Sequence, residues 1–197
     1  MQTEEGSVAM EVVCAIQDIV EAELANNVEY SSLLQRALKL MPELRPDPQA
    51  PESVEVSGCR HLPRTLSLGA ASPAASVADA IGRLAPSLAW QQNPRYNVGN
   101  KGALFMENYG WSSLGLTGNE KMAFGVLLLG PGVEYPPTSY ESEGLFIVIG
   151  GSPEWKSGDA AWRRVNAGDV ICRPFGGSEG KRPGNEPMLA LYAWMYR

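Results

Sequence analysis

The sequence has few of the side chains that most often bind metal ions or carry acid–base chemistry. Its 197 residues include a single histidine, His61, and three cysteines, Cys14, Cys59 and Cys172. The odd number and wide spacing of the cysteines argue against a disulfide framework and a CxxC metal site. Cys59 and His61 form a lone Cys-x-His pair, two ligands short of a zinc site, and no GxSxG elbow accompanies His61 as a catalytic base. We expect Cys172 to be a buried apolar residue rather than a reactive thiol.

Basic charge and long hydrophobic runs are also scarce. The 16 Lys and Arg residues are scattered and the net charge is -6, which argues against a nucleic-acid partner. The longest apolar runs, "MAFGVLLLG" and "MLALYAWM", have about half of the roughly 20 residues needed to cross a membrane. The start, "MQTEEGSVAM", carries two glutamates where a secretory signal carries basic residues. We therefore predict a cytoplasmic protein that does not interact with membranes.

The first half of the sequence has the periodicity of amphipathic helices. Apolar residues recur at spacings of three and four over residues 8–25 and again over 32–40, and a third helix is predicted from Ser76. Between them, residues 45–53 contain three prolines and are typical of an extended connector. We therefore predict a helical region over residues 1–90.

After Trp90 the pattern changes to short β-rich runs separated by turn signals such as "TGNE", "SGD" and "NAGD". Their spacing is typical of an antiparallel barrel or jelly roll, and it predicts an all-β second half over residues 91–197. Helices followed by strands indicate an α+β fold in which the helices pack on the outside of a barrel, as one compact unit. The predicted β-rich runs are residues 102–111, 121–130, 145–151, 161–165, 169–174 and 188–196.

Two segments carry a resemblance to a known family. "LLLGPGVEYPPTSYESEGLFIVIGGSPEWKSGDAAWRRVNAGDVICRPFGG" and "GNEPMLALYAWMYR" resemble the cupins, and more narrowly the cupin-type dimethylsulfoniopropionate (DMSP) lyases. The helical half, with "CRHLP" and "LAPSLAWQQNP", fits the same family. The resemblance implies a double-stranded β-helix barrel. It also implies a carbon–sulfur lyase that uses a divalent metal, zinc, iron, manganese or nickel, to split DMSP into dimethyl sulfide and acrylate.

The family's site residues are replaced in this sequence. Its motifs, His-x-His-x-x-x-Glu-x-Tyr and Pro-x-Gly-x-x-His, imply metal ligands at Thr138, Tyr140, Gly144 and Glu179 and a catalytic base at Phe146, and all five residues differ. Hydroxyl groups are poor metal donors, glycine offers none, and one carboxylate does not make a site. Phe146 lacks the oxygen that would accept the α-proton. We therefore expect no metal cofactor and the loss of β-elimination, as in a pseudoenzyme.

The replacements leave an aromatic pocket, which keeps several hypotheses open. Tyr140 and Phe146 should project into the former metal cavity, beside Tyr135 and Trp194 at aromatic positions of the family, and with Glu179 they suit a small sulfonium or quaternary ammonium cation. Alternatively the rings only fill the cavity, Glu179 reaches solvent and the barrel is inert. A third hypothesis keeps the lyase active, with Tyr140 or Tyr135 as base and Glu179 as anchor. A homo-oligomer is also compatible with the sequence.

Overall fold

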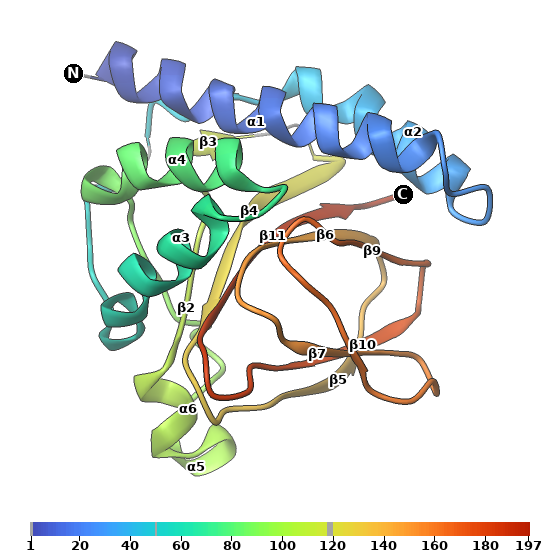
Figure 1. Ribbon diagram of the computed structural model, residues 1–197. Helices are drawn as coiled ribbons and strands as arrows, with labels where there is room; N and C mark the ends of the chain where they lie inside the picture. Colours follow the sequence, from blue (N-terminus) through green and yellow to red (C-terminus); the bar gives the residue numbers. More distant parts are fainter. Residues whose placement is uncertain (1, 50, 118–119) are drawn as a thin grey trace.

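The computed structural model describes residues 2–49, 51–117 and 120–197. Four helices of the first half lie together over one side of a β-barrel, which the second half forms (Figure 1). Within the described ranges, no helix combines the length and hydrophobicity required to cross a bilayer. The α-helices are α1 (Gln2–Leu24), α2 (Ser31–Leu40), α3 (Leu62–Ala70), α4 (Ala75–Leu84), α5 (Val98–Lys101) and α6 (Ala103–Glu107). The 3-10 helices are η1 (Met41–Glu43), η2 (Ser57–His61) and η3 (Ala85–Ser87).

The strands form two facing antiparallel sheets and one small accessory sheet. The larger sheet has the order β2-β4-β11-β6-β9, and the smaller barrel sheet has the order β5-β10-β7-β8. A two-stranded sheet joins β1 to β3, so that part of the predicted connector is paired with the second half of the chain. The strands are β1 (Arg45–Pro46), β2 (Tyr109–Ser112), β3 (Leu116–Thr117), β4 (Met122–Leu129), β5 (Tyr135–Ser139), β6 (Glu143–Gly150), β7 (Glu154–Ser157), β8 (Arg163–Arg164), β9 (Val170–Arg173), β10 (Ser178–Arg182) and β11 (Met188–Met195).

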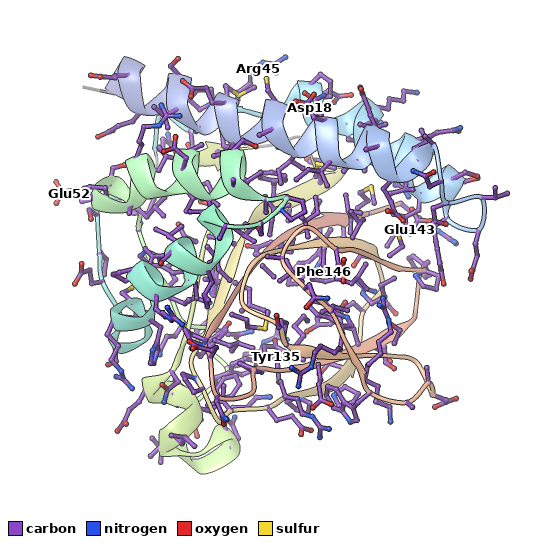
Figure 2. All side chains as sticks on the ribbon, in the orientation of Figure 1. Asp18, Arg45, Glu52, Tyr135, Glu143 and Phe146 are labelled. Carbon is purple, nitrogen blue, oxygen red and sulfur yellow. The ribbon has the colours of Figure 1, made fainter. Side chains whose placement is uncertain are left out.

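The larger sheet separates two hydrophobic clusters. Successive residues of a strand point to opposite faces, so each central strand contributes to both. On β6, Ile147 packs with the helices α1 to α4 on one face, whereas Phe146 packs inside the barrel on the other. Figure 2 shows Phe146 and Tyr135 within the ring of strands. Because both faces are covered, the strands that were predicted from continuous apolar runs, β4, β6 and β11, are the buried centre of the sheet.

A close contact between α3 and β6 fixes the helices on the sheet. A β-carbon on Gly150 would lie 2.0 Å from the carbonyl oxygen of Thr65, and one on Gly69 would lie 2.5 Å from the carbonyl oxygen of Ile149. Only glycine allows the two backbones to approach this closely. This contact fixes α3 against β6, the strand whose other face lines the barrel interior.

The structure confirms the α+β cupin architecture and corrects two parts of the prediction. Residues 103–107 form α6 rather than a strand, because "ALFME" consists mainly of good helix formers and Asn97 caps the preceding helix α5 by accepting a hydrogen bond from the Asn100 amide at 3.1 Å. The second half is therefore not all-β. Strand β10 was not predicted, because its barrel-facing side chains are charged rather than apolar.

Candidate functional site

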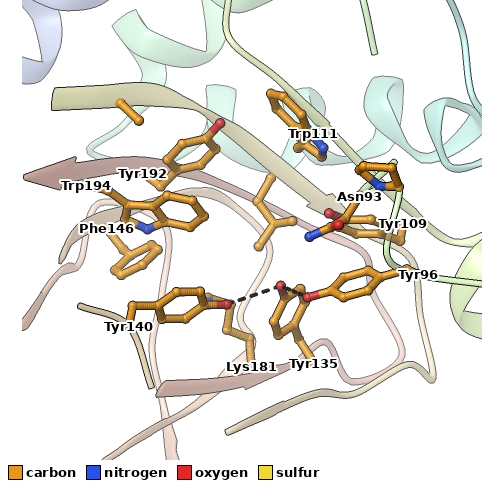
Figure 3. Close-up of a pocket in the computed structure, with 13 residues that line it drawn as sticks. Asn93, Tyr96, Tyr109, Trp111, Tyr135, Tyr140, Phe146, Lys181, Tyr192 and Trp194 are labelled. Atoms are coloured by element: carbon orange, nitrogen blue, oxygen red, sulfur yellow. Dashed lines mark hydrogen bonds between the residues drawn. The ribbon is translucent and has the colours of Figure 1, made fainter. Parts of the chain in front are cut away.

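A cavity of about 350 Å³ lies inside the barrel and is lined mainly by aromatic rings. Its volume is within the range of roughly 300–1,000 Å³ that is typical of small-molecule sites. Strands β2, β5, β6 and β11 each contribute rings, and the segment before α5 closes one side (Figure 3). The wall consists of Asn93, Pro94, Tyr96, Tyr109, Trp111, Ala123, Leu127, Tyr135, Tyr140, Phe146, Lys181, Tyr192 and Trp194.

The rings form two walls across the cavity. On one side, Trp194 stacks on Tyr140 with ring centroids 5.3 Å apart and contacts Tyr192 at 4.8 Å. On the opposite side lie Tyr109 and Tyr96, whose centroids are 5.7 Å apart (Figure 3). Ring faces carry partial negative charge, so a cation between such walls is attracted from several directions. This arrangement offers ring faces for cation–π contacts on two sides of the cavity.

Three tyrosine hydroxyl groups form a chain along the floor of the cavity. The Tyr96 and Tyr135 oxygens are 2.6 Å apart, and the Tyr135 and Tyr140 oxygens are 3.3 Å apart (Figure 3). Burial raises the pKa of Tyr135 far above its ordinary value, and burial likewise raises the pKa of Tyr140. These phenols therefore remain protonated at neutral pH and act as hydrogen-bond partners rather than as bases.

A buried ion cluster lies beside the rings. Glu179 accepts a hydrogen bond from Lys181 Nζ at 2.8 Å through Oε1, and its Oε2 lies 3.2 Å from Arg173 Nε. All three side chains are buried, with at most 2% of their surface exposed. Arg173 also donates to the carbonyl oxygen of Ser142 at 2.7 Å and to its hydroxyl at 3.1 Å. The cluster contains two basic groups and one carboxylate, so it carries an excess of positive charge when Lys181 is protonated.

Lys181 brings this charge to the cavity. Its Nζ lies 5.0, 4.7 and 4.8 Å from the ring centroids of Tyr135, Phe146 and Trp155. Burial lowers the pKa of Lys181, and the neighbouring Glu179 carboxylate opposes that shift. Among the described residues, Lys181 is the one charged group on the cavity wall. Lys181 therefore places a basic group at the cavity wall.

Four of the five predicted ligand-binding residues, Tyr135, Tyr140, Phe146 and Trp194, line the cavity. Glu179 does not. It was expected to face either a bound cation or solvent, but it is buried and its charge is taken up by Arg173 and Lys181.

The positions that correspond to the family's metal ligands offer a poor donor set. The hydroxyl of Thr138 donates to the carbonyl oxygen of Pro136 at 2.9 Å, outside the cavity wall. At Gly144 a β-carbon would lie 2.9 Å from Arg173 Nε, so the guanidinium fills the space of a side chain there. Glu179 already has two basic partners. In the described ranges, no three His, Cys, Asp or Glu side chains are grouped as a metal site requires.

The other residues considered from the sequence, His61, Cys59 and Cys172, make contacts within the fold and are not on the cavity wall. His61 Nε2 lies 2.7 Å from Asn108 Oδ1, where both side chains pack against Gly130, and Cys59 Sγ accepts from the Val56 amide at 3.4 Å. Cys172 is buried in the helix-facing cluster, and burial raises its pKa to about 12. The expectation that Cys172 is a buried apolar residue is thus confirmed.

Several wall residues were missed from the sequence, although the alternation of side chains along a strand could have found Tyr192 and Lys181. Tyr192 lies two residues before the predicted Trp194 on β11, and so the two share a face. Lys181 shares a face with Glu179 on β10 for the same reason, but only if residues 178–182 are recognised as a strand. Tyr96 lies in a loop, and nothing in its local sequence indicates that it reaches the cavity.

The fold, with its cavity inside the barrel, defines this chain as a cupin with an added helical layer. The sequence profile of the dimethylsulfoniopropionate lyase family matches residues 29–190, and the chain therefore belongs to that family. No curated protein matches it.

Solved structures agree with this assignment at the level of the fold. A chain from the crystal structures of the DMSP lyases RdDddP and RnDddQII superposes with a TM-score of 0.77 at 18% identity, covering 97% of this chain and 93% of the other. DMSP lyase DddQ from Ruegeria pomeroyi DSS-3 superposes with a TM-score of 0.61 at 22% identity, covering 90% and 91% of the two chains. The helical region is thus included in the shared architecture.

Proposed function

We propose that this cupin binds a small sulfonium or quaternary ammonium compound in its aromatic cavity and has lost the metal-dependent elimination of DMSP. The observation that carries the proposal is that aromatic rings, and not metal-ligating side chains, line the cavity. Eight of the thirteen wall residues are aromatic, and none of the described wall residues is acidic. Each cation–π contact contributes about 0.5–2 kcal/mol, so that several together can support binding of a small cation.

The residues at the metal-ligand positions do not fit a divalent ion. Relatives of the cupin lyase type generally depend on such an ion, which needs several imidazole or carboxylate ligands. Here Thr138 is turned to a backbone carbonyl, Gly144 has no side chain, and the single carboxylate of Glu179 is neutralised by Lys181 and Arg173. We therefore derive no catalytic step through a metal for this chain.

An active lyase that uses Tyr135 or Tyr140 as base is the weaker alternative. Both hydroxyls would have to lose a proton near neutral pH, whereas burial raises the pKa of each phenol. Glu179 would also have to anchor the substrate, but it is not on the cavity wall. The geometry supports hydrogen bonding by these tyrosines and gives no route to proton abstraction.

The binding part is tested by isothermal titration with glycine betaine and 3,3-dimethylbutyrate. These two molecules have the same shape, but a carbon replaces the quaternary nitrogen in the second, so that only the first carries an onium charge. We expect betaine to bind more tightly, and Trp194→Leu to weaken its binding roughly tenfold or less, as the loss of one strong cation–π contact allows. Trp162→Leu is the matched control, because Trp162 contacts Arg182 and is not on the cavity wall.

The loss of activity is tested by headspace analysis for dimethyl sulfide. The protein is incubated with millimolar DMSP after chelator treatment, and separately with added zinc, iron, manganese or nickel. We expect no release above that of heat-denatured protein in any sample. Dimethyl sulfide production in any of them would refute the loss of elimination. Failure of every onium compound to bind would refute the binding function.

A further inference from the structure

We propose that Lys181 holds a carboxylate group of the ligand, so that the cavity selects zwitterionic onium acids over onium cations without an acid group. This inference rests on the proposed binding function and specifies its ligand class. The two halves of such a molecule match two different parts of the cavity: the rings suit the onium group, and the ammonium group of Lys181 suits the carboxylate.

The first argument is the balance of charge. Arg173 and Lys181 share one carboxylate, that of Glu179, and all three side chains are buried. The guanidinium of Arg173 has further acceptors in Ser142, whereas Lys181 faces aromatic rings. Buried charges are stable when they are paired, and with Lys181 protonated the site has one positive charge more than it has negative, which an anion would balance. An incoming carboxylate would supply that missing charge.

The second argument is the number of free hydrogen-bond donors. An ammonium group has three N–H donors and no acceptor. Lys181 Nζ has one hydrogen-bonded partner among the described residues, Glu179 Oε1, and its other close neighbours are ring faces. Lys181 therefore has N–H donors that no acceptor among the described residues takes up, as a carboxylate ligand requires.

The third argument is the fixed position of the ammonium group. Glu179 and Lys181 lie two residues apart on β10 and share its barrel face, so their hydrogen bond restrains the lysine side chain. Within its own sheet, Lys181 is paired in register with Tyr135 on the neighbouring strand β5 and with Trp155 on the neighbouring strand β7. A lysine held in this way loses little side-chain freedom when a ligand binds.

Lys181 also gives a physical reason why the cavity would reject cations that lack an acid group. A cation without an acid group would enter a cavity whose one charged wall residue, among those described, is basic, and like charges repel. A zwitterion brings its own anion to that residue. Selection therefore has an attractive and a repulsive component.

The inference is tested by titrating the full-length protein with glycine betaine and choline. The two ligands share a trimethylammonium group, and choline carries a hydroxyl where betaine carries the carboxylate. We expect betaine to bind at least about tenfold more tightly, as a charge-assisted hydrogen bond provides. Equal affinities would overturn the inference while leaving the onium-binding function intact. Binding of neither ligand would refute the proposed function itself, and with it this inference.

The variant Lys181→Met tests whether Lys181 causes the preference for betaine over choline. It leaves Glu179 paired with Arg173, and we expect it to lose the preference for betaine and to bind choline more tightly than the unmodified protein. Lys156→Met is the matched control on the neighbouring strand β7, and it should keep the preference. A preserved preference in Lys181→Met would overturn the role of Lys181. If that variant does not fold, the comparison of the two ligands on the unmodified protein still decides the inference.

Discussion

Removing the charge of Glu179 should strongly destabilise the barrel. The substitution Glu179→Gln keeps the size of the side chain but leaves Arg173 and Lys181 without their shared counter-ion, 3.2 and 2.8 Å away. All three side chains have at most 2% of their surface exposed, so little solvent is available to compensate for the lost carboxylate. Breaking a buried pair in this way costs about 3–5 kcal/mol, which for a chain of this size corresponds to a fall of roughly 6–20 °C in Tm.

The measurement is urea unfolding followed by tryptophan fluorescence, together with a thermal melt. Glu186→Gln is the matched control, because it makes the same chemical change in the exposed ion pair with Arg64 and should have little effect on stability. Glu179→Gln combined with Lys181→Met should recover part of the loss, since one buried cation is then removed. If Glu179→Gln and Glu186→Gln had equal effects, the ion cluster would not be the structural element described here.

Two further predictions concern the sheet and its helical layer. The substitution Gly150→Ala would place a β-carbon 2.0 Å from the carbonyl oxygen of Thr65 and should cost about 1–3 kcal/mol in urea unfolding, whereas Gly184→Ala, with open space around it, should be nearly neutral; equal effects would contradict the close packing of α3 on β6. Because burial raises the pKa of Cys172 to about 12, we expect a thiol reagent at pH 8 to modify the exposed Cys14 quickly and Cys172 only after unfolding, which mass spectrometry of the labelled peptides would show.

The parts of the fold that could be predicted are those where one physical signal dominates. Continuous apolar runs identified β4, β6 and β11 because both faces of the larger sheet are covered, and helical periodicity identified α1, α2 and α4. Helix α3 was missed because "LPRTLSLGA" is short and contacts the sheet partly through a glycine. Helix α6 was mistaken for a strand because it is only five residues long, four of them apolar, and lies next to a true strand, β2.

The aromatic character of the cavity was predictable, but its charge was not. Tyr140, Phe146 and Trp194 could be assigned from their places in short motifs, and they line the cavity. The charge of the wall depends on which of the two barrel-facing charged residues of β10, Glu179 or Lys181, lies at the cavity, and this follows from three-dimensional packing. Glu179 turns to Arg173 on a different strand, β9, so that Lys181 is left on the wall.

Because the cluster of Arg173, Glu179 and Lys181 consists of side chains, the charge beside the pocket does not depend on the supply of metal ions. A positive centre that consists of side chains is made together with the polypeptide and keeps its composition whatever ions the cell supplies. Chelators cannot extract it, and competing metals cannot exchange with it. Recognition of an anionic group by this barrel would then depend on the covalent structure of the chain and not on trace-element supply.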